Sequence, residues 1–204
     1  MCQEVFKIVQ NMDKSHIETR IALQCAPLIT GIKISNLLIV SKEDEKNIRI
    51  ILKKSGMMYY RLLRQKDKTT FLLFNKTQLA LYLQNMEVQK ILKVNGYKDL
   101  SLGGILRTFQ YRYETYMNQG EDFPHEMGLL LGYPVEDVEG FIVHKGQEFL
   151  YSGYWKVYHD VPAKKKLFYE YENAKEQLIQ LLANGYDMRS IIELYRDSHT
   201  KIAV

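Results

Sequence analysis

The fold is decided by residues 123–160, which read FPHEMGLLLGYPVEDVEGFIVHKGQEFLYSGYWKVYHD and include the only tryptophan of the chain, Trp155. Proline is favoured in the first turn of a helix, and glycine is favoured just beyond its last turn. This spacing predicts two helices, over residues 124–131 and 134–143, each opened by a proline. A Lys-Gly turn follows, and the alternation of the next residues predicts a strand over residues 149–158.

Three further strands are predicted upstream of this stretch. Residues 36–40 read NLLIV, a short continuous apolar run that is typical of a buried strand. Residues 57–64 and 70–74 are strand-like and are joined by the polar turn QKDK, which indicates a β-hairpin. A helix over residues 43–54 separates the first strand from this hairpin. The order predicts a right-handed crossover followed by an antiparallel neighbour, and so a small mixed sheet of about four strands.

The remaining apolar residues recur at helical spacing. Pro27 disfavours the helical conformation at the residue before it, so we expect the second helix to end near Cys25. Helices are predicted over residues 4–12, 17–25, 77–85, 87–94, 101–118, 161–183 and 187–195. The sequence therefore predicts an α+β fold, a small mixed sheet covered by several helices, in a single domain over residues 1–196. Residues 197–204 are expected to form a disordered tail.

The composition bounds the class of protein. The chain has 204 residues and a formal net charge of +4, with acidic and basic residues interspersed. It can bury a sizeable core and lacks a broad basic surface, so we do not expect a nucleic-acid partner. The two cysteines, Cys2 and Cys25, cannot build a disulfide framework, and no segment has the pattern of a signal peptide or a membrane span. These features predict a cytoplasmic protein without membrane contact and leave the oligomeric state open.

His125, followed by Glu126 at a helix start, is the sharpest candidate for chemistry. Histidine titrates near neutral pH, and a nearby carboxylate can tune it. Adjacent residues on a helix do not face each other, so a structural role for His125 is the alternative. Cys25, His125 and Glu126 are the candidate catalytic residues, as thiol nucleophile, base and orienting group. The alternative for Cys25 is a small buried residue, because the end of a helix disfavours a thiolate.

Signals for metals and cofactors are weak. The side chains of His125, His144, His159 and Cys25 do not have the spacing of known metal sites, so no metal site is predicted. No glycine-rich nucleotide motif occurs, and the cofactor is unknown from the sequence. Two basic clusters are candidate phosphate-binding groups, with a solvated surface as the alternative for both. They are Lys164, Lys165 and Lys166 beside Tyr169 and Tyr171, and Arg61, Arg64, Lys66 and Lys68 around the hairpin.

Two stretches of the chain resemble a known family. CAPLITGIK, residues 25–33, and FPHEMGLLLGYPVEDVEGFIVHKG with GYWKVYHD, within residues 123–160, resemble an uncharacterised family of anaerobic Gram-positive bacteria, described as a domain of unknown function. Between them only the order of elements is similar. The chain departs from the family pattern at Gln24, where a histidine often precedes the cysteine, and at Val143-His144, where an acidic-polar pair is common. The first departure weakens a His-Cys pair in that loop. The resemblance implies a cytosolic bacterial protein of similar length, and it implies no activity.

Three functions remain open on the sequence alone. The first, which we place ahead, is binding of a small anionic ligand where CAPLITGIK meets FPHEMG, with Lys33, His125 and Lys156 as polar contacts and Tyr133 and Trp155 as walls. The second is a thiol- or histidine-dependent enzyme that uses the catalytic candidates above. The third is an interaction or nucleic-acid-binding module built on the tyrosine-rich sheet and the basic hairpin. The first two predict that Cys25, Lys33 and His125 converge within one pocket.

Overall fold

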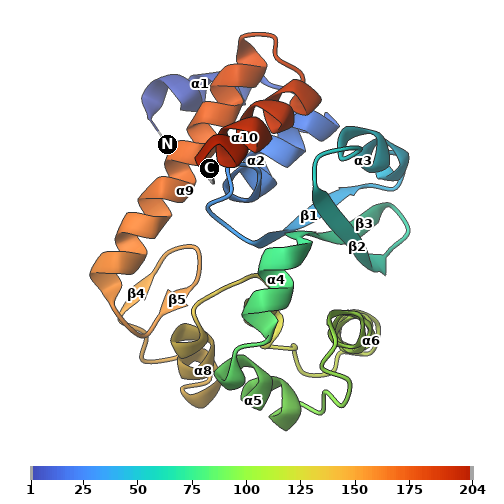
Figure 1. Cartoon of the computed structure of the whole chain (residues 1–204), viewed down its shortest axis with the longest axis vertical. Helices are drawn as coiled ribbons and strands as arrows, with labels where there is room; N and C mark the ends of the chain where they lie inside the picture. The colour runs from blue at the N-terminus through green and yellow to red at the C-terminus, as the bar shows by residue number, and fades with distance from the viewer. Residues whose placement is uncertain (1, 203–204) are drawn as a thin grey trace.

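The computed structural model describes residues 2–202 of the chain and the side chains of residues 2–196. It confirms the α+β class, since helices surround small antiparallel sheets (Figure 1). Within the described residues, the main sheet has three strands in the order β1-β3-β2. These strands are β1 (Ser35–Ser41), β2 (Met57–Arg64) and β3 (Lys68–Asn75).

The pairing in this sheet differs from the predicted mixed arrangement. Both β1 and β2 run antiparallel to β3. The two strands that point in the same direction are separated by β3, so no parallel pair shares hydrogen bonds. The hairpin predicted from the QKDK turn is correct, and it brings β3 into the centre of the sheet.

β3 lies between the two larger apolar cores, and a third, smaller cluster of the described residues forms around Trp155 with Val157, Phe168 and Tyr171. Phe71 and Leu73 lie in the first core, and Leu72 and Phe74 lie in the second, all of them at most 4% exposed. Side chains alternate across a strand, so neighbouring residues of β3 must enter opposite cores. The unbroken apolar sequence FLLF is what a strand buried on both faces requires.

The first core joins the two ends of the chain. Here α2 packs against β1 and against the long helix α9, which has the predicted bounds (Figure 1). α9 contributes Ala174, Leu178 and Ile179 to this core. Its helices are α1 (Gln3–Asn11), α2 (Ile17–Ile29), α3 (Glu45–Ile51), α9 (Val161–Ala183) and α10 (Met188–Ile202).

The second core lies on the other face of the sheet, where α6 packs against β2. Phe109 of α6 and Leu79 of α4 are buried at its centre. The helices around it are α4 (Lys76–Leu83), α5 (Met86–Val94), α6 (Leu102–Gln119), α7 (Met127–Leu130) and α8 (Val135–Val143). The last two come from the stretch that decides the fold, so this stretch completes the second core.

The predicted fourth strand, residues 149–158, is a separate two-stranded hairpin instead. It consists of β4 (Tyr151–Ser152) and β5 (Lys156–Val157), and the N–H of Gly153 donates to the carbonyl of Trp155 across the turn. A Cβ atom on Gly153 would lie 2.3 Å from the Phe168 ring of α9. The chain therefore turns at the glycine, because only glycine allows so close an approach to α9.

Two predicted helix boundaries were wrong. α2 continues through Pro27 to Ile29, where the hydroxyl of Thr30 donates to the carbonyl of Ala26 and the N–H of Lys33 donates to the carbonyl of Pro27. These bonds satisfy carbonyls at the helix end and support a longer helix than the proline rule predicts. The helix predicted over residues 124–131 is reduced to the single turn of α7.

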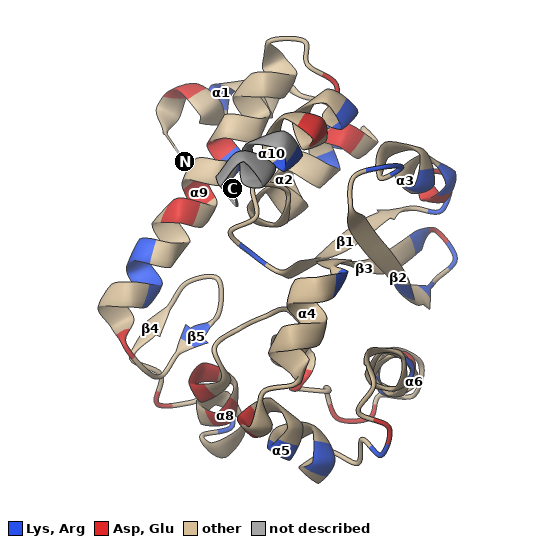
Figure 2. Ribbon diagram, in the orientation of Figure 1, with Lys and Arg blue, Asp and Glu red and all other residues tan. Residues whose placement is uncertain are grey.

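Acidic and basic residues lie on most elements (Figure 2). None of the described helices is both long and apolar enough to cross a membrane. The backbone of α10 extends to Ile202. The tail predicted over residues 197–204 lies outside the residues whose side chains are described.

Candidate functional site

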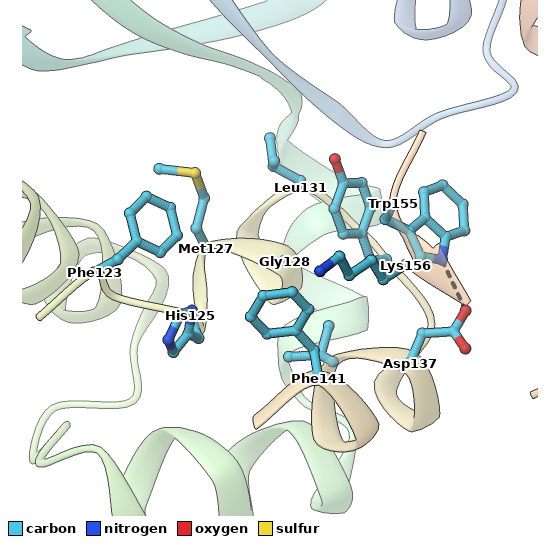
Figure 3. Close-up of a pocket in the computed structure, with 11 residues that line it drawn as sticks. Phe123, His125, Met127, Gly128, Leu131, Asp137, Phe141, Trp155 and Lys156 are labelled. Carbon is cyan, nitrogen blue, oxygen red and sulfur yellow. Dashed lines mark hydrogen bonds between the residues drawn. The ribbon is translucent and has the colours of Figure 1, made fainter. Parts of the chain in front are cut away.

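A pocket of about 510 Å3 lies between α7, α8 and the β4–β5 hairpin (Figure 3). Most of its lining is aromatic or aliphatic, and its polar side chains are few. The residues that line it are Phe123, His125, Met127, Gly128, Leu131, Tyr133, Asp137, Val138, Phe141, Trp155 and Lys156. Every one of them comes from the stretch over residues 123–160.

The Trp155 wall is fixed by the buried carboxylate of Asp137, which is 2% exposed. One carboxylate oxygen accepts the indole N–H of Trp155 at 2.7 Å. The other accepts the backbone N–H groups of Tyr158 at 2.8 Å and His159 at 3.1 Å. Asp137 thereby ties the hairpin to the first turn of α8. Since a buried carboxylate needs such partners, the wall is held in place before any ligand arrives.

Two aromatic rings and a glycine complete the wall. Tyr133 stacks on Trp155 with 4.5 Å between ring centres. Gly128 lets α7 approach α8, because a Cβ atom there would lie 2.7 Å from the Val138 side chain. A larger residue at this position would push the two helices apart and deform the pocket.

Lys156 brings a cation into this apolar setting. Its Nζ donates to the carbonyl of Gly146 at 2.6 Å and lies 4.8 Å from the Phe149 ring centre and 5.7 Å from that of Phe141. Figure 3 shows the side chain crossing the pocket above Phe141. None of the carboxylates described in the structure forms an ion pair with it. The ammonium therefore keeps donors available for an anion.

His125 lies at the other end of the pocket, exposed, with its ring 5.5 Å from that of Phe123 and 5.0 Å from that of Phe141. Its imidazole forms no hydrogen bond with the part of the chain that the structure describes. The predicted contacts His125, Tyr133, Trp155 and Lys156 therefore line a single pocket.

A family model described as "Protein of unknown function (DUF3793)" matches residues 21–192. The chain belongs to this family. The matched region contains the whole pocket and every candidate residue predicted from the sequence. No curated protein and no solved structure matches the chain.

Cys25 of this DUF3793 member lies in the first core and contributes no atom to the pocket lining. Its side chain is fully buried, and its Sγ lies 3.7 Å from the carbonyl oxygen of Leu37. Burial raises the pKa of the Cys25 thiol to about 12. The thiol is therefore protonated at neutral pH, a poor state for a nucleophile.

Lys33 is close to the pocket but sealed from it. The side chain is buried, and its Nζ donates to Asn36 at 2.6 Å and lies 5.1 Å from the Tyr133 ring centre. Lys33 does not line the pocket. Its ammonium contacts the ring of Tyr133, and Tyr133 is a lining residue. Burial lowers the pKa of Lys33 to about 8.

Glu126 faces away from His125. It is 1% exposed and accepts hydrogen bonds from Nε of Arg112 at 2.5 Å and from the hydroxyl of Tyr97 at 2.9 Å. These partners belong to the second core and to α6 beside it, and Glu126 does not line the pocket. The structure therefore gives Glu126 an ion pair with α6 in place of a contact with the imidazole.

The two predicted basic clusters contain paired cations. Arg61 and Arg64 both lie within ion-pair distance of Glu45. Lys164 is buried and forms an ion pair with Glu136. Among the described residues, no group of three or more His, Cys, Asp or Glu side chains is arranged to hold a metal ion.

Asp137, Phe123 and Phe141 are pocket residues that the sequence did not reveal. Acidic residues are common in the first turn of a helix because the helix dipole favours them there. The position of Asp137 therefore did not indicate that it accepts a hydrogen bond from Trp155. The two phenylalanines are apolar residues at ordinary core spacing. The one usable signal was the density of aromatic residues around the single tryptophan.

Proposed function

We propose that the protein binds a small, mainly apolar ligand that carries one anionic group, in the pocket between α7, α8 and the β4–β5 hairpin. The observation that carries this proposal is the Lys156 ammonium, which lies among aromatic rings without a carboxylate partner in the described part of the chain. A cation in apolar surroundings is costly unless a counter-ion is supplied. A bound anion would supply it.

The size and shape of the pocket support a small molecule. A pocket of about 510 Å3 falls within the range of roughly 300–1,000 Å3 that is usual for ligand sites. The stacked rings of Tyr133 and Trp155 offer a flat wall, which favours a planar or ring-bearing apolar group. His125, at the opposite end from this wall, is a second polar contact of the ligand.

The enzyme hypothesis receives less support from the geometry. The Cys25 thiol lies in the first core, and Glu126 is bonded to Arg112 and Tyr97. Of the catalytic candidates, only His125 reaches the pocket. A binding protein needs no further group, so we place binding ahead of catalysis. A cytoplasmic location and a bacterial source, implied by the family resemblance, stay part of this proposal.

Fluorescence of Trp155 tests the proposal directly, because no other tryptophan contributes to the signal. The probes are 3-phenylpropionate, an aromatic anion, and its neutral amide. We expect the anion to bind the unmodified protein about tenfold more tightly than the amide, as one charge-assisted hydrogen bond predicts. Lys156→Met is expected to remove this preference and leave the affinity for the amide unchanged.

Lys166→Met is the matched control, because Lys166 is exposed on α9 and does not line the pocket. It should keep the full preference for the anion. Equal affinity of the two probes for the unmodified protein, or a preference that survives Lys156→Met, would contradict the proposal. Failure of both probes to change the fluorescence would also count against it.

A further inference from the structure

A second hollow lies on the opposite side of the molecule from the hairpin, against the first core. Its volume is about 640 Å3, and its lining combines four cations with one exposed isoleucine. Arg49 and Ile50 belong to α3, Lys53 and Lys54 follow that helix, and Arg189 belongs to α10. We call this set the basic hollow. Figure 2 shows cationic segments on α3 and at the start of α10, on the same side of the molecule.

The backbone around the basic hollow is held in place by bonds to the core. Lys54 has a positive φ of 66°, so the chain turns sharply just after α3. The carbonyl of Lys54 accepts a hydrogen bond from Arg196 of α10 at 2.8 Å. α3 is anchored in the first core by Ile48, and α10 is anchored by Met188. The two elements that carry the cations therefore have a fixed separation.

Three of the four cations of the basic hollow, Arg49, Lys53 and Lys54, have no carboxylate beside them in the described part of the chain. None of Arg49, Lys53, Lys54 and Arg189 forms an ion pair with a carboxylate of those residues. The other basic clusters differ, since Arg61 and Arg64 share Glu45. The carboxylate of Asp187 caps α10 by accepting the N–H of Ser190 and does not line the hollow. Hydrogen bonds from Ser190 lower the pKa of Asp187, and the charge of Arg189 lowers it further, so Arg189 is compensated in part.

Gathering like charges in this way costs stability, because each cation repels the others. The whole chain has a formal net charge of only +4, and four cations, of which only Arg189 interacts with a carboxylate among the described residues, line this one concave surface. A ligand with several negative charges would relieve the repulsion. Arginine binds phosphate through two parallel hydrogen bonds, and lysine adds a point charge.

We propose that the basic hollow binds a short phosphate chain, either free or as the triphosphate group of a nucleotide. The recognised chemistry is a linear run of phosphates, with the two arginines and two lysines as its donors. Ile50, which is 57% exposed, covers one side of the bound chain. The site is separate from the pocket at Lys156 and does not depend on the function proposed for that pocket.

Calorimetric titration with tripolyphosphate, ATP and AMP in metal-free buffer tests this proposal. We expect tripolyphosphate and ATP to bind alike and AMP to bind much more weakly, because only the phosphates are recognised. Binding should weaken as salt rises from about 50 mM to about 200 mM, as charge-driven binding to phosphates does. AMP binding as tightly as ATP would overturn the proposal.

Arg49→Gln/Lys53→Gln is expected to lower the affinity for tripolyphosphate about tenfold or more, because the variant removes two charge-assisted hydrogen bonds to the phosphates. Arg189→Gln, on the other element, should lower it as well. The matched control is Lys165→Gln/Lys166→Gln, which removes the same charge from exposed positions on α9 and should change the affinity less than about twofold.

All substituted side chains are exposed, and an unchanged thermal unfolding midpoint will show that the variants fold. Equal losses of affinity in the two double variants would mean a general attraction to a basic chain and would overturn the proposal. Binding of a single-stranded oligonucleotide without binding of tripolyphosphate would overturn it too, in favour of a nucleic-acid partner.

Discussion

The region around Lys33 and the region around Lys156 use the same chemistry, a lysine ammonium beside aromatic rings, with different results. Nζ of Lys33 lies 5.1 Å from the Tyr133 ring centre, and Nζ of Lys156 lies 4.8 Å from that of Phe149. Lys33 is 6% exposed and bonded to the Asn36 side chain, whereas Lys156 donates to a backbone carbonyl and lines a pocket. The first region is sealed and the second is open.

A cation among aromatic rings therefore indicates a ligand site only where a pocket lies beside it. In the sealed region the space is taken by α2 and β1, and the polar needs of Lys33 are met within the chain. In the open region Asp137 ties the hairpin to α8, and a pocket lies beside Lys156. Substitutions in and beside the two regions can break or sharpen this contrast.

The largest change in the free energy of unfolding is expected from Asp137→Ala, which removes bonds in the open region and leaves the Lys33 region unchanged. It leaves the Trp155 indole N–H and two backbone N–H groups without their acceptor. We expect the free energy of unfolding to fall by about 3–5 kcal/mol, as for a buried charged group that loses its bonds. Urea unfolding measures this change, and the Trp155 emission should move to longer wavelength. Asp122→Ala, at an exposed position, is the control, and a loss as small as in this control would contradict the role of Asp137.

Glu126→Ala is expected to cost about 2–4 kcal/mol, because Arg112 and the Tyr97 hydroxyl lose their shared acceptor. The neighbouring change His125→Ala should cost less than about 0.5 kcal/mol, since His125 is exposed. Only His125→Ala should weaken binding of 3-phenylpropionate per folded molecule. If binding were lost in Glu126→Ala alone, Glu126 and not His125 would be the residue that contacts the ligand.

Lys33→Met sharpens the contrast through pH. Burial lowers the pKa of Lys33 from its ordinary 10.5 to about 8, so the folded state bears the cost of the charge below pH 8 and is relieved of it as pH rises toward 10.5. Between about pH 7 and about pH 9 the unmodified protein should gain about 1 kcal/mol of stability relative to the variant. Urea midpoints of both proteins at each pH measure this difference. A constant difference would mean that Lys33 is solvated.

The range ends at pH 9 because above it the thiol of Cys25 begins to titrate, and its charge interacts with that of Lys33: a charged Cys25 raises the pKa of Lys33, and a charged Lys33 lowers the pKa of Cys25. Burial raises the pKa of that thiol from its ordinary 9.0 to about 12, so its contribution to stability is lost as pH rises through this interval. Cys25→Ala in both backgrounds should leave the difference below pH 9 unchanged. A dependence on Cys25 in that range would assign the effect to the thiol.

Lys156→Met should change the free energy of unfolding least, by less than about 0.5 kcal/mol, because its head group lies at a pocket and gives up a single hydrogen bond. The side chain of methionine keeps the aliphatic contact with Phe149. Thermal unfolding gives the comparison with Lys33→Met. A loss above about 1 kcal/mol would show that Lys156 is a structural residue like Lys33.

The sequence predicts most of the elements because their signals are local. The apolar run NLLIV, the QKDK turn and the stripe over residues 161–183 each require only neighbouring residues, and β1, the β2–β3 hairpin and α9 appear where they predict. The continuation of α2 through Pro27 was missed because it depends on bonds made by Thr30 and Lys33, beyond the helix.

The site was predicted in part for the same reason. His125, Tyr133, Trp155 and Lys156 lie within residues 123–160, whose helix and turn signals are local, and α7, α8 and the hairpin that they form enclose the pocket. Lys33, Cys25 and Glu126 depend on packing over longer separations, which decides whether a polar side chain faces a pocket or a core. The local pattern of one sequence does not show which distant residues pack against each other.

The position of β3 between the two larger cores has a consequence for how the protein unfolds. Consecutive side chains of this strand serve different cores, so neither core is complete without it. A slip of one residue in its pairing would exchange the two sets of side chains and damage both cores at once. The two cores therefore cannot unfold independently, and we expect a single cooperative transition in which probes placed in either core report the same midpoint.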